Sequence, residues 1–194
     1  MSVVTFHRTW LLAIVTCLPL LALLLTPELM RSRAGSGQLL MIGTLALLAL
    51  LVAAFIAAPW MSAVAAPVAE RWTPRSAIGQ SRAVWRTRRG SAWLALGVAV
   101  LIYAAAQAVG YWVGTVVPSV SDNPAYGTDA SEPRWLIDYP AYVLQALTIY
   151  AITTIAIAWY GWRMRTLSLA STGARTRASA TRSRETLTGR SYTS

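Results

Sequence analysis

Three polar side chains recur at helical spacing inside a long apolar stretch of the sequence. Tyr103, Gln107 and Tyr111 stand at i, i+4 and i+8, which puts them on one face of a helix. An amide without a hydrogen-bond partner is costly in hydrocarbon, so we expect Gln107 to face protein rather than lipid. The face fits either packing against a helix, within the chain or in another subunit, or the lining of a small ligand cavity.

Further residues in two apolar stretches extend this candidate face. Gly110 and Gly114 form a small-xxx-small pair close to it, a pattern that lets membrane helices approach closely. In the next apolar stretch, Thr148 and Tyr150 carry hydroxyl groups at a depth where either can meet the amide of Gln107. The complete candidate face comprises Tyr103, Gln107, Gly110, Tyr111, Gly114, Gln145 and Thr148.

Few other residues have types and spacing suited to chemistry. His7 is the one histidine and has no neighbouring carboxylate or cysteine, which makes a poor metal site. Neither a glycine-rich phosphate loop nor a His-Glu-x-x-His pair occurs. The acidic residues of segment 119–138 can bind a cation or simply form a solvated loop, and their spacing matches no calcium-binding loop. We therefore predict no enzyme activity, no cofactor and no metal.

The apolar residues are gathered into four blocks long enough to cross a bilayer. Hydrophobic residues make up 56% of the chain and charged residues 12%. The expected spans are about 10–26, 39–60, 92–117 and 139–162, the first being near the lower length limit and kinked at Pro19. A cleaved signal peptide is the alternative for the first block, but Leu25–Glu28 lacks a small-residue cleavage pattern.

Arginine placement orients these spans. The net charge is +10, and all 17 basic residues are arginines. With the amino terminus inside, the cytoplasmic segments hold one, six and seven arginines, and the outer loops hold three. This excess predicts that both termini are cytoplasmic, because positive residues concentrate on that side. Arginines lying between apolar blocks also argue against a nucleic-acid partner, and the absence of lysine indicates a bacterial source.

The central basic segment, residues 70–91, interleaves tryptophan with arginine. Trp72 and Trp85 favour the headgroup layer, so we expect this segment to lie on the cytoplasmic leaflet in contact with anionic lipid. A helix over 77–88 would turn Ile78, Val84 and Trp85 toward lipid. The alternative is that the arginines only orient the chain. The expected lipid contacts are Arg71, Arg75, Arg82, Arg86, Arg88 and Arg89.

The composition divides the chain at about residue 165. Residues 166–194 are mostly Ser, Thr, Ala, Gly and Arg, which bury too little apolar area to offset chain entropy. The predicted fold is an all-α membrane protein: a four-helix transmembrane domain over 1–165, built as two in-out-in hairpins, and a disordered basic cytoplasmic tail.

Several short motifs in the first ninety residues resemble a known family. Thr9-Trp10, Leu18-Pro19-Leu20 and the stretch from Ala69-Glu70-Arg71 through Ala77-Ile78-Gly79 are similar to the four-span sensor domain of actinobacterial membrane proteins and histidine kinases. The resemblance implies two helical hairpins and a sensor role. The second half departs from the pattern at Val98-Ala99-Val100, where a second Leu-Pro pair is expected.

These observations predict a non-catalytic protein of the bacterial cytoplasmic membrane. We expect a sensor-like or accessory subunit that binds other membrane proteins through its helices, with a membrane-protein partner or a second copy of itself. The alternative is a small transporter or channel subunit that uses the polar face of the third span.

Overall fold

The computed structural model is mainly helical in the part of the chain that it describes. It describes all residues except 1–2, 27–28, 30–36, 69–71, 117–138 and 190–194, and within the helices it leaves out the side chains of 37, 115–116, 139–140 and 174–189. These described ranges contain no strand, and one isolated bridge joins Val68 to Trp72. The named helices are α1 (Val3–Thr16), α2 (Leu18–Leu24), α4 (Gly37–Ala65), α5 (Ala77–Thr87), α6 (Arg89–Val116) and α7 (Tyr139–Gly189).

Three of these helices are long and apolar enough to cross a membrane. The qualifying segments are Gln38–Ala65, Arg89–Gly114 and Ala141–Gly173; the first contains the expected second apolar block, and the other two cover most of the third and fourth. Helices α1 and α2 qualify only as a pair, bent by 52°, so length and composition allow three spans or four. The prediction of several membrane-spanning helices is confirmed at this level, and the arrangement as two hairpins stays a prediction.

The first apolar block is broken, as its proline predicts. Helix α1 ends at Thr16, and α2 begins at Leu18 with Pro19 in its first turn. Proline has no N–H to donate and crowds the preceding turn, so the helix cannot continue straight through it. The helix begins earlier than the expected span, at Val3 rather than Trp10.

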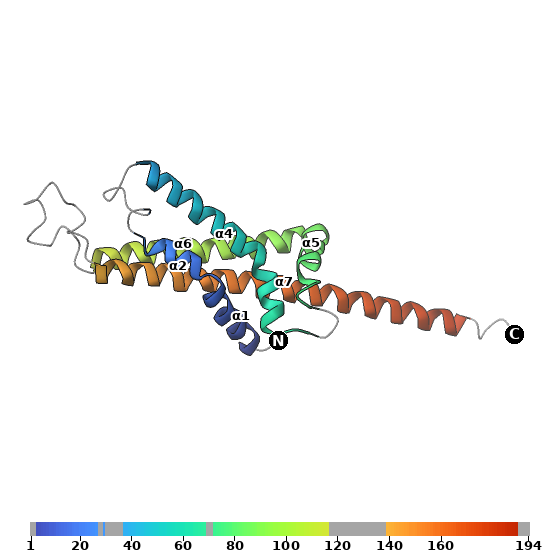
Figure 1. Cartoon of the computed structure of the whole chain (residues 1–194). Coiled ribbons are helices and arrows are strands. Elements are labelled where there is room, and N and C mark those ends of the chain that lie inside the picture. The colour runs from blue at the N-terminus through green and yellow to red at the C-terminus, as the bar shows by residue number, and fades with distance from the viewer. Residues whose placement is uncertain (1–2, 27–28, 30–36, 69–71, 117–138, 190–194) are drawn as a thin grey trace, which may run out of the picture.

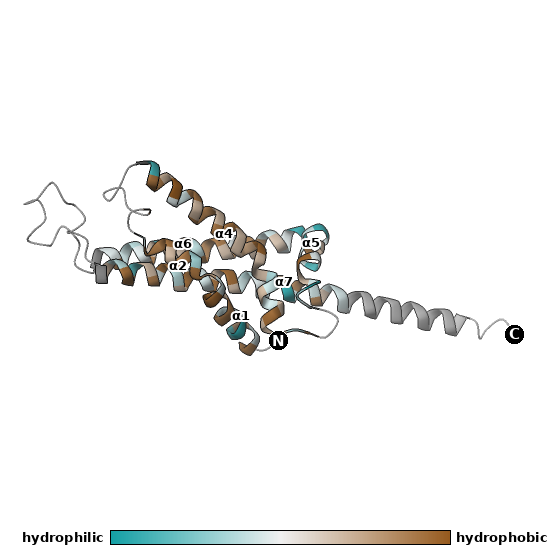
Figure 2. Ribbon diagram, viewed as in Figure 1, coloured by the Kyte–Doolittle hydropathy of each residue, from teal (hydrophilic) through white to brown (hydrophobic). Residues whose placement is uncertain are grey.

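Helix α7 is the central element of the bundle (Figure 1). It contacts α1, α2, α4, α5 and α6. Many buried positions along these contacts are alanines, among them Ala58, Ala95, Ala99 and Ala156, each with no exposed surface. Small side chains allow close helix approach where lipid supplies no hydrophobic driving force. Large apolar side chains are exposed along both α4 and α6, and most of the α4 ribbon is coloured as hydrophobic (Figure 2).

Helix α7 continues well beyond the expected end of the fourth span. The composition predicts disorder from Thr166, whereas the structure is helical to Gly189. Leu167 and Ser168 are buried, and the Ser168 hydroxyl donates to Oε1 of Gln80 at 2.8 Å. Packing against α5 therefore supports this part of α7, and composition alone carries no information about such a contact.

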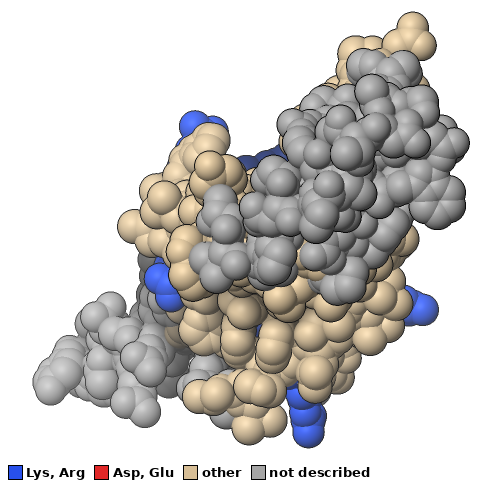
Figure 3. Space-filling view, turned by 90° about the vertical axis from the view of Figure 1, so that its left-hand side faces the viewer, with Lys and Arg blue, Asp and Glu red and all other residues tan. Residues whose placement is uncertain are grey.

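The charged groups lie toward one end of the bundle. Helix α5 and the start of α6 form one end of the bundle, which we call the α5 end. The N-terminal part of α1 points toward this end (Figure 1). Viewed from the opposite end, the described surface is mostly uncharged and arginines project only at its rim (Figure 3). None of the seven acidic residues has a described side chain, so arginine provides every charged group that the structure describes.

Candidate functional site

The two glycines of the candidate face lie in the contact between α6 and α7. A Cβ built on Gly114 would stand 3.0 Å from Nε2 of Gln145, and one on Gly110 would overlap the side chain of Ile149. Both glycines therefore pack against α7 of the same chain. Of the candidate residues, the structure brings Gly110, Gly114 and Gln145 together at this contact.

The polar members of the face are not all covered by this contact. Tyr103 is half-buried, Gln107 is exposed, and Tyr111 is 73% exposed. The amide of Gln107 makes no hydrogen bond to any residue that the structure describes. The described residues thus give the outer part of this face, Gln107 and Tyr111, no hydrogen-bond partner.

The expected intrachain partners of Gln107 are engaged elsewhere. The hydroxyl of Thr148 donates to the carbonyl of Leu144 in its own helix at 2.8 Å. The hydroxyl of Tyr150 donates to the carbonyl of Ile14 on α1. No hydrogen bond joins Gln107 to Thr148 or Tyr150 in the described structure. A threonine hydroxyl in a helix has a backbone acceptor within one turn, and this local bond competes with any distant one.

A small cavity lies between Gln107 and the core. Its volume is about 10 Å³, and Tyr103, Gln107, Tyr150 and Thr153 contribute its polar lining among leucines of α2 and α4. The hydroxyl oxygen of Thr153 is buried and has no hydrogen-bond partner in the described structure. A volume near that of one probe sphere holds at most one water molecule. It has no room for an organic ligand in this conformation.

Three side chains on one face of α7 hold the broken α1–α2 segment. The hydroxyls of Tyr142 and Tyr150 donate to backbone carbonyls of the segment, and Thr154 accepts from the indole of Trp10 at 3.1 Å. Where a helix ends, its last carbonyls lack helical donors. Tyr150 satisfies one of them, at Ile14. Sequence reasoning missed this role, although the spacing of 142, 150 and 154 beside a proline-broken helix is a usable signal.

A buried arginine joins α7 to the end of α4. Arg165 is only 4% exposed, and its Nη1 donates to the carbonyl of Ser62 at 3.0 Å. Ser62 lies in the last turn of α4, where carbonyls are unpaired and the helix dipole favours a cation. The Ser62 hydroxyl also accepts from the fully buried indole of Trp72 at 3.1 Å. The position of Arg165 after an apolar block did not reveal that it is buried.

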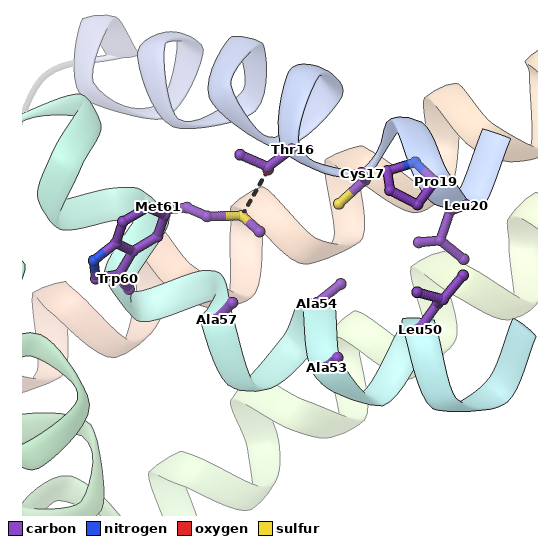
Figure 4. A pocket seen from close by; sticks show the side chains of 10 residues that line it. All are labelled: Thr16, Cys17, Pro19, Leu20, Leu50, Ala53, Ala54, Ala57, Trp60 and Met61. Carbon is purple, nitrogen blue, oxygen red and sulfur yellow. Dashed lines mark hydrogen bonds between the residues drawn. The ribbon is translucent and has the colours of Figure 1, made fainter. Parts of the chain in front are cut away.

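Two apolar hollows flank α4. One, of about 260 Å³, lies beside the bend between α1 and α2, with the Cys17 thiol beside it and the Thr16 hydroxyl 3.4 Å from the sulfur of Met61 (Figure 4). The other, of about 360 Å³, lies between α4 and α6, and we call it the α4–α6 groove. Its walls are Leu51, Val52, Phe55, Ile56, Trp85, Leu96, Val100, Tyr103 and Tyr160.

The basic segment forms the expected helix but turns a different face toward the bundle. Helix α5 spans Ala77–Thr87, close to the expected 77–88. Val84 is 2% exposed and belongs to the protein core, so the expectation that it faces lipid is wrong. Ile78 is exposed, and Trp85 is half-buried against Tyr160. Val84 is covered where α5 packs against the bundle, and this packing cannot be read from the periodicity of α5.

The arginines expected to contact lipid lie at the α5 end. The side chains of Arg75, Arg82, Arg86 and Arg89 are exposed, and that of Arg88 is half-buried. Arg71 lies outside the described residues. Within the described ranges, no three His, Cys, Asp or Glu side chains are grouped so as to hold a metal ion.

Comparison with known proteins identified no relative. No protein-family model, curated protein or solved structure matches this chain. The resemblance to a four-span sensor domain therefore stays a prediction.

Proposed function

We propose that this chain is a non-catalytic subunit of the bacterial cytoplasmic membrane, sensor-like or accessory, that binds another membrane protein. In this proposal α1 and α2 form one broken span, the chain crosses the bilayer four times, and α5 and both termini are cytoplasmic. The exposed arginines of α5 and of the start of α6 lie at one end of the bundle, and the N-terminal part of α1 points toward the same end. Positive residues concentrate on the cytoplasmic side of a membrane, so this distribution supports the proposed orientation.

The unpaired amide of Gln107 is the observation that carries the binding proposal. Gln107 stands 18 residues after Arg89 on α6, or about 27 Å along the helix axis at 1.5 Å per residue. If Arg89 lies at the inner headgroups, the amide remains within the bilayer, whose hydrocarbon is about 30 Å thick. An amide without a hydrogen bond costs roughly 2–7 kcal/mol in hydrocarbon, and Gln107, near the outer edge of that layer, falls toward the lower end of this range.

A second transmembrane helix relieves this cost. A partner helix that carries an amide or hydroxyl at the depth of Gln107 would bond to it, and Tyr111 extends the same face by one turn. Interhelical hydrogen bonds of this type contribute about 1–2 kcal/mol in model peptides. We therefore propose that the partner binds along Gln107 and Tyr111, both of which are exposed on α6.

Transport is the alternative function. A transporter or channel needs a continuous polar path, and the polar cavity beside Gln107 has a volume of only about 10 Å³. A path therefore requires several copies that turn their α6 faces toward a shared pore. Conduction by a single copy in liposomes would overturn the proposed accessory function.

Site-specific photo-crosslinking in native membranes tests the binding proposal. A crosslinking residue at Gln107 or Tyr111 should give one discrete adduct that contains a second membrane protein. The matched control is Ala105, which is exposed at nearly the same depth but points about 160° away around the helix. Equal adducts from positions 105 and 107 would contradict a specific docking face.

The variant Gln107→Leu supplies the second arm of this test. Leucine removes the amide and retains the apolar bulk, so the adduct formed from position 111 should weaken while the subunit itself still accumulates. An adduct that is unchanged in Gln107→Leu would show that the amide does not hold the partner. An adduct composed of two copies of this chain would instead assign the face to self-association.

A further inference from the structure

The wall that α6 contributes to the α4–α6 groove follows one helical face from the α5 end inward. Arg89, Trp93, Leu96, Val100 and Tyr103 stand at i, i+4, i+7, i+11 and i+14, the spacing of a single stripe. At 1.5 Å per residue, Leu96 lies about 10 Å deeper than Arg89 and Tyr103 about 10 Å deeper again. From the α5 end inward, α6 thus presents the cation of Arg89, then the indole of Trp93, and then the apolar residues that line the trough.

Aromatic side chains form the shallow end of this groove. The indole N–H of Trp85 donates to the hydroxyl of Tyr160 at 3.1 Å, which holds the Trp85 ring as part of the wall. Trp93 stands edge-on to that ring, with centroids 5.3 Å apart, and is itself 64% exposed. Indoles prefer the boundary between headgroups and acyl chains. The groove therefore opens at the level expected for that boundary.

Positive charge surrounds the same end. Arg82 and Arg86 are exposed and lie one turn apart on α5, with Trp85 between them in sequence. Arg89 begins α6 close by and is also exposed. No described side chain is a carboxylate, so the described structure contains no ion pair that would neutralise these guanidinium groups.

We propose that the α4–α6 groove is a binding site for an anionic phospholipid of the cytoplasmic leaflet. One acyl chain occupies the trough between α4 and α6, and the phosphate headgroup is bound by Arg82, Arg86 and Arg89. The trough of about 360 Å³ lies within the range of about 300–1,000 Å³ of ordinary ligand sites. The site lies toward the α5 end from Gln107, so it is independent of the partner proposed there.

The groove has positive charge at one end and apolar walls along the rest, and this arrangement favours a phospholipid over other occupants. A partner helix would match the groove only if an apolar surface ended in acidic residues at the level of these three arginines, which have no carboxylate partner among the described residues. A phospholipid has its negative charge at one end and hydrocarbon at the other, so it matches both the arginines and the apolar trough. A neutral lipid would use the trough and leave the arginines without an anion.

Native mass spectrometry of the full chain, with added lipid, tests the proposal. The purified protein is titrated with phosphatidylglycerol and, separately, with phosphatidylcholine. We expect a first phosphatidylglycerol adduct of higher affinity than any phosphatidylcholine adduct. Replacing Arg82, Arg86 and Arg89 together by glutamine should lower the phosphatidylglycerol affinity about a hundredfold, at about fivefold for each basic residue near an anionic surface. Arg8→Gln, at an exposed arginine of α1 outside the groove, is the control.

Groove-filling variants test the acyl-chain half of the proposal. Leu96→Trp fills the trough from α6, and Val52→Trp fills it from α4 in case the first variant does not fold. Leu94→Trp adds the same side chain at a position that is 61% exposed and outside the groove. We expect the groove-filling variants to lose the high-affinity adduct and Leu94→Trp to retain it.

Three results would overturn the proposal. Retention of the adduct in both groove-filling variants would reduce the interaction to headgroup adsorption at the surface. Equal affinity for phosphatidylcholine and phosphatidylglycerol would remove the role of the arginines. A stable dimer whose formation is blocked by Leu96→Trp would assign the groove to a contact between two copies of the chain.

Discussion

The contact between Gly161 on α7 and Ala58 on α4 gives the sharpest prediction of stability. A Cβ built on Gly161 would stand 2.7 Å from the carbonyl carbon of Ala58 and 3.3 Å from its Cβ, closer than real Cβ contacts. The obstruction includes backbone, which cannot move away as the end of a flexible side chain can. The variant Gly161→Ala must therefore push the two helices apart.

The expected size follows from two opposing contributions. Overpacking of a close contact costs about 1–3 kcal/mol. Alanine gains about 0.5–1 kcal/mol over glycine in a helix interior, because it loses less backbone entropy on folding. The variant Gly161→Ala should therefore be destabilised, typically by about 1 kcal/mol and by up to about 2.5 kcal/mol.

Gly97 on α6 provides a matched control. It also lies inside a long helix, but a Cβ there would meet nothing within 4 Å. The variant Gly97→Ala should therefore stabilise the protein by about 0.5–1 kcal/mol through helix propensity alone. The difference between the two variants removes the propensity contribution and leaves the steric cost of about 1–3 kcal/mol.

The assay is reversible unfolding in mixed micelles of mild detergent and dodecyl sulfate. Circular dichroism follows the loss of helix, and the midpoints of wild type, Gly161→Ala and Gly97→Ala are compared at one protein concentration. A shift of the same sign and size in both variants would refute the close contact between α4 and α7.

Two further outcomes follow from the same structure. Replacing Tyr150 by phenylalanine removes the hydroxyl that bonds to Ile14, so we expect a loss of about 1 kcal/mol in the same unfolding assay, while Tyr111→Phe, at a side chain 73% exposed, should change little. A reporter that is active only in the cytoplasm should be active when fused after Thr87, and a reporter that is active only outside should be active when fused after Gly127. The reverse pattern would contradict the proposed orientation.

The apolar blocks were sufficient to predict the helices because the pattern is local. A run of uncharged residues in lipid must satisfy its own backbone groups, and a helix does so within the run itself. The break before Pro19 was predictable for the same reason, since the missing N–H belongs to the residue. The extension of α7 through Leu167 and Ser168 was not predictable, because it depends on packing against α5.

The candidate site divides in the same way. Helical spacing correctly puts Tyr103, Gln107 and Tyr111 on one stripe, and the structure brings Gly110 and Gly114 against α7. Spacing along one helix does not specify which neighbouring helix, if any, covers the stripe. The hydroxyls of Thr148 and Tyr150 donate to backbone carbonyls in the structure, and spacing along α6 does not reveal this.

The amino-acid sequence by itself determined that this chain forms long apolar helices, that the first is broken and that arginine is concentrated in particular connections. These properties depend on residue chemistry and on hydrogen bonds within one segment. The tertiary structure decided that Arg165 is buried against the end of α4, that Tyr142 and Tyr150 hold the broken segment, and that no described residue bonds to the amide of Gln107. Such contacts join residues more than a hundred positions apart or report what a packed neighbour covers, and only the relative placement of helices determines them.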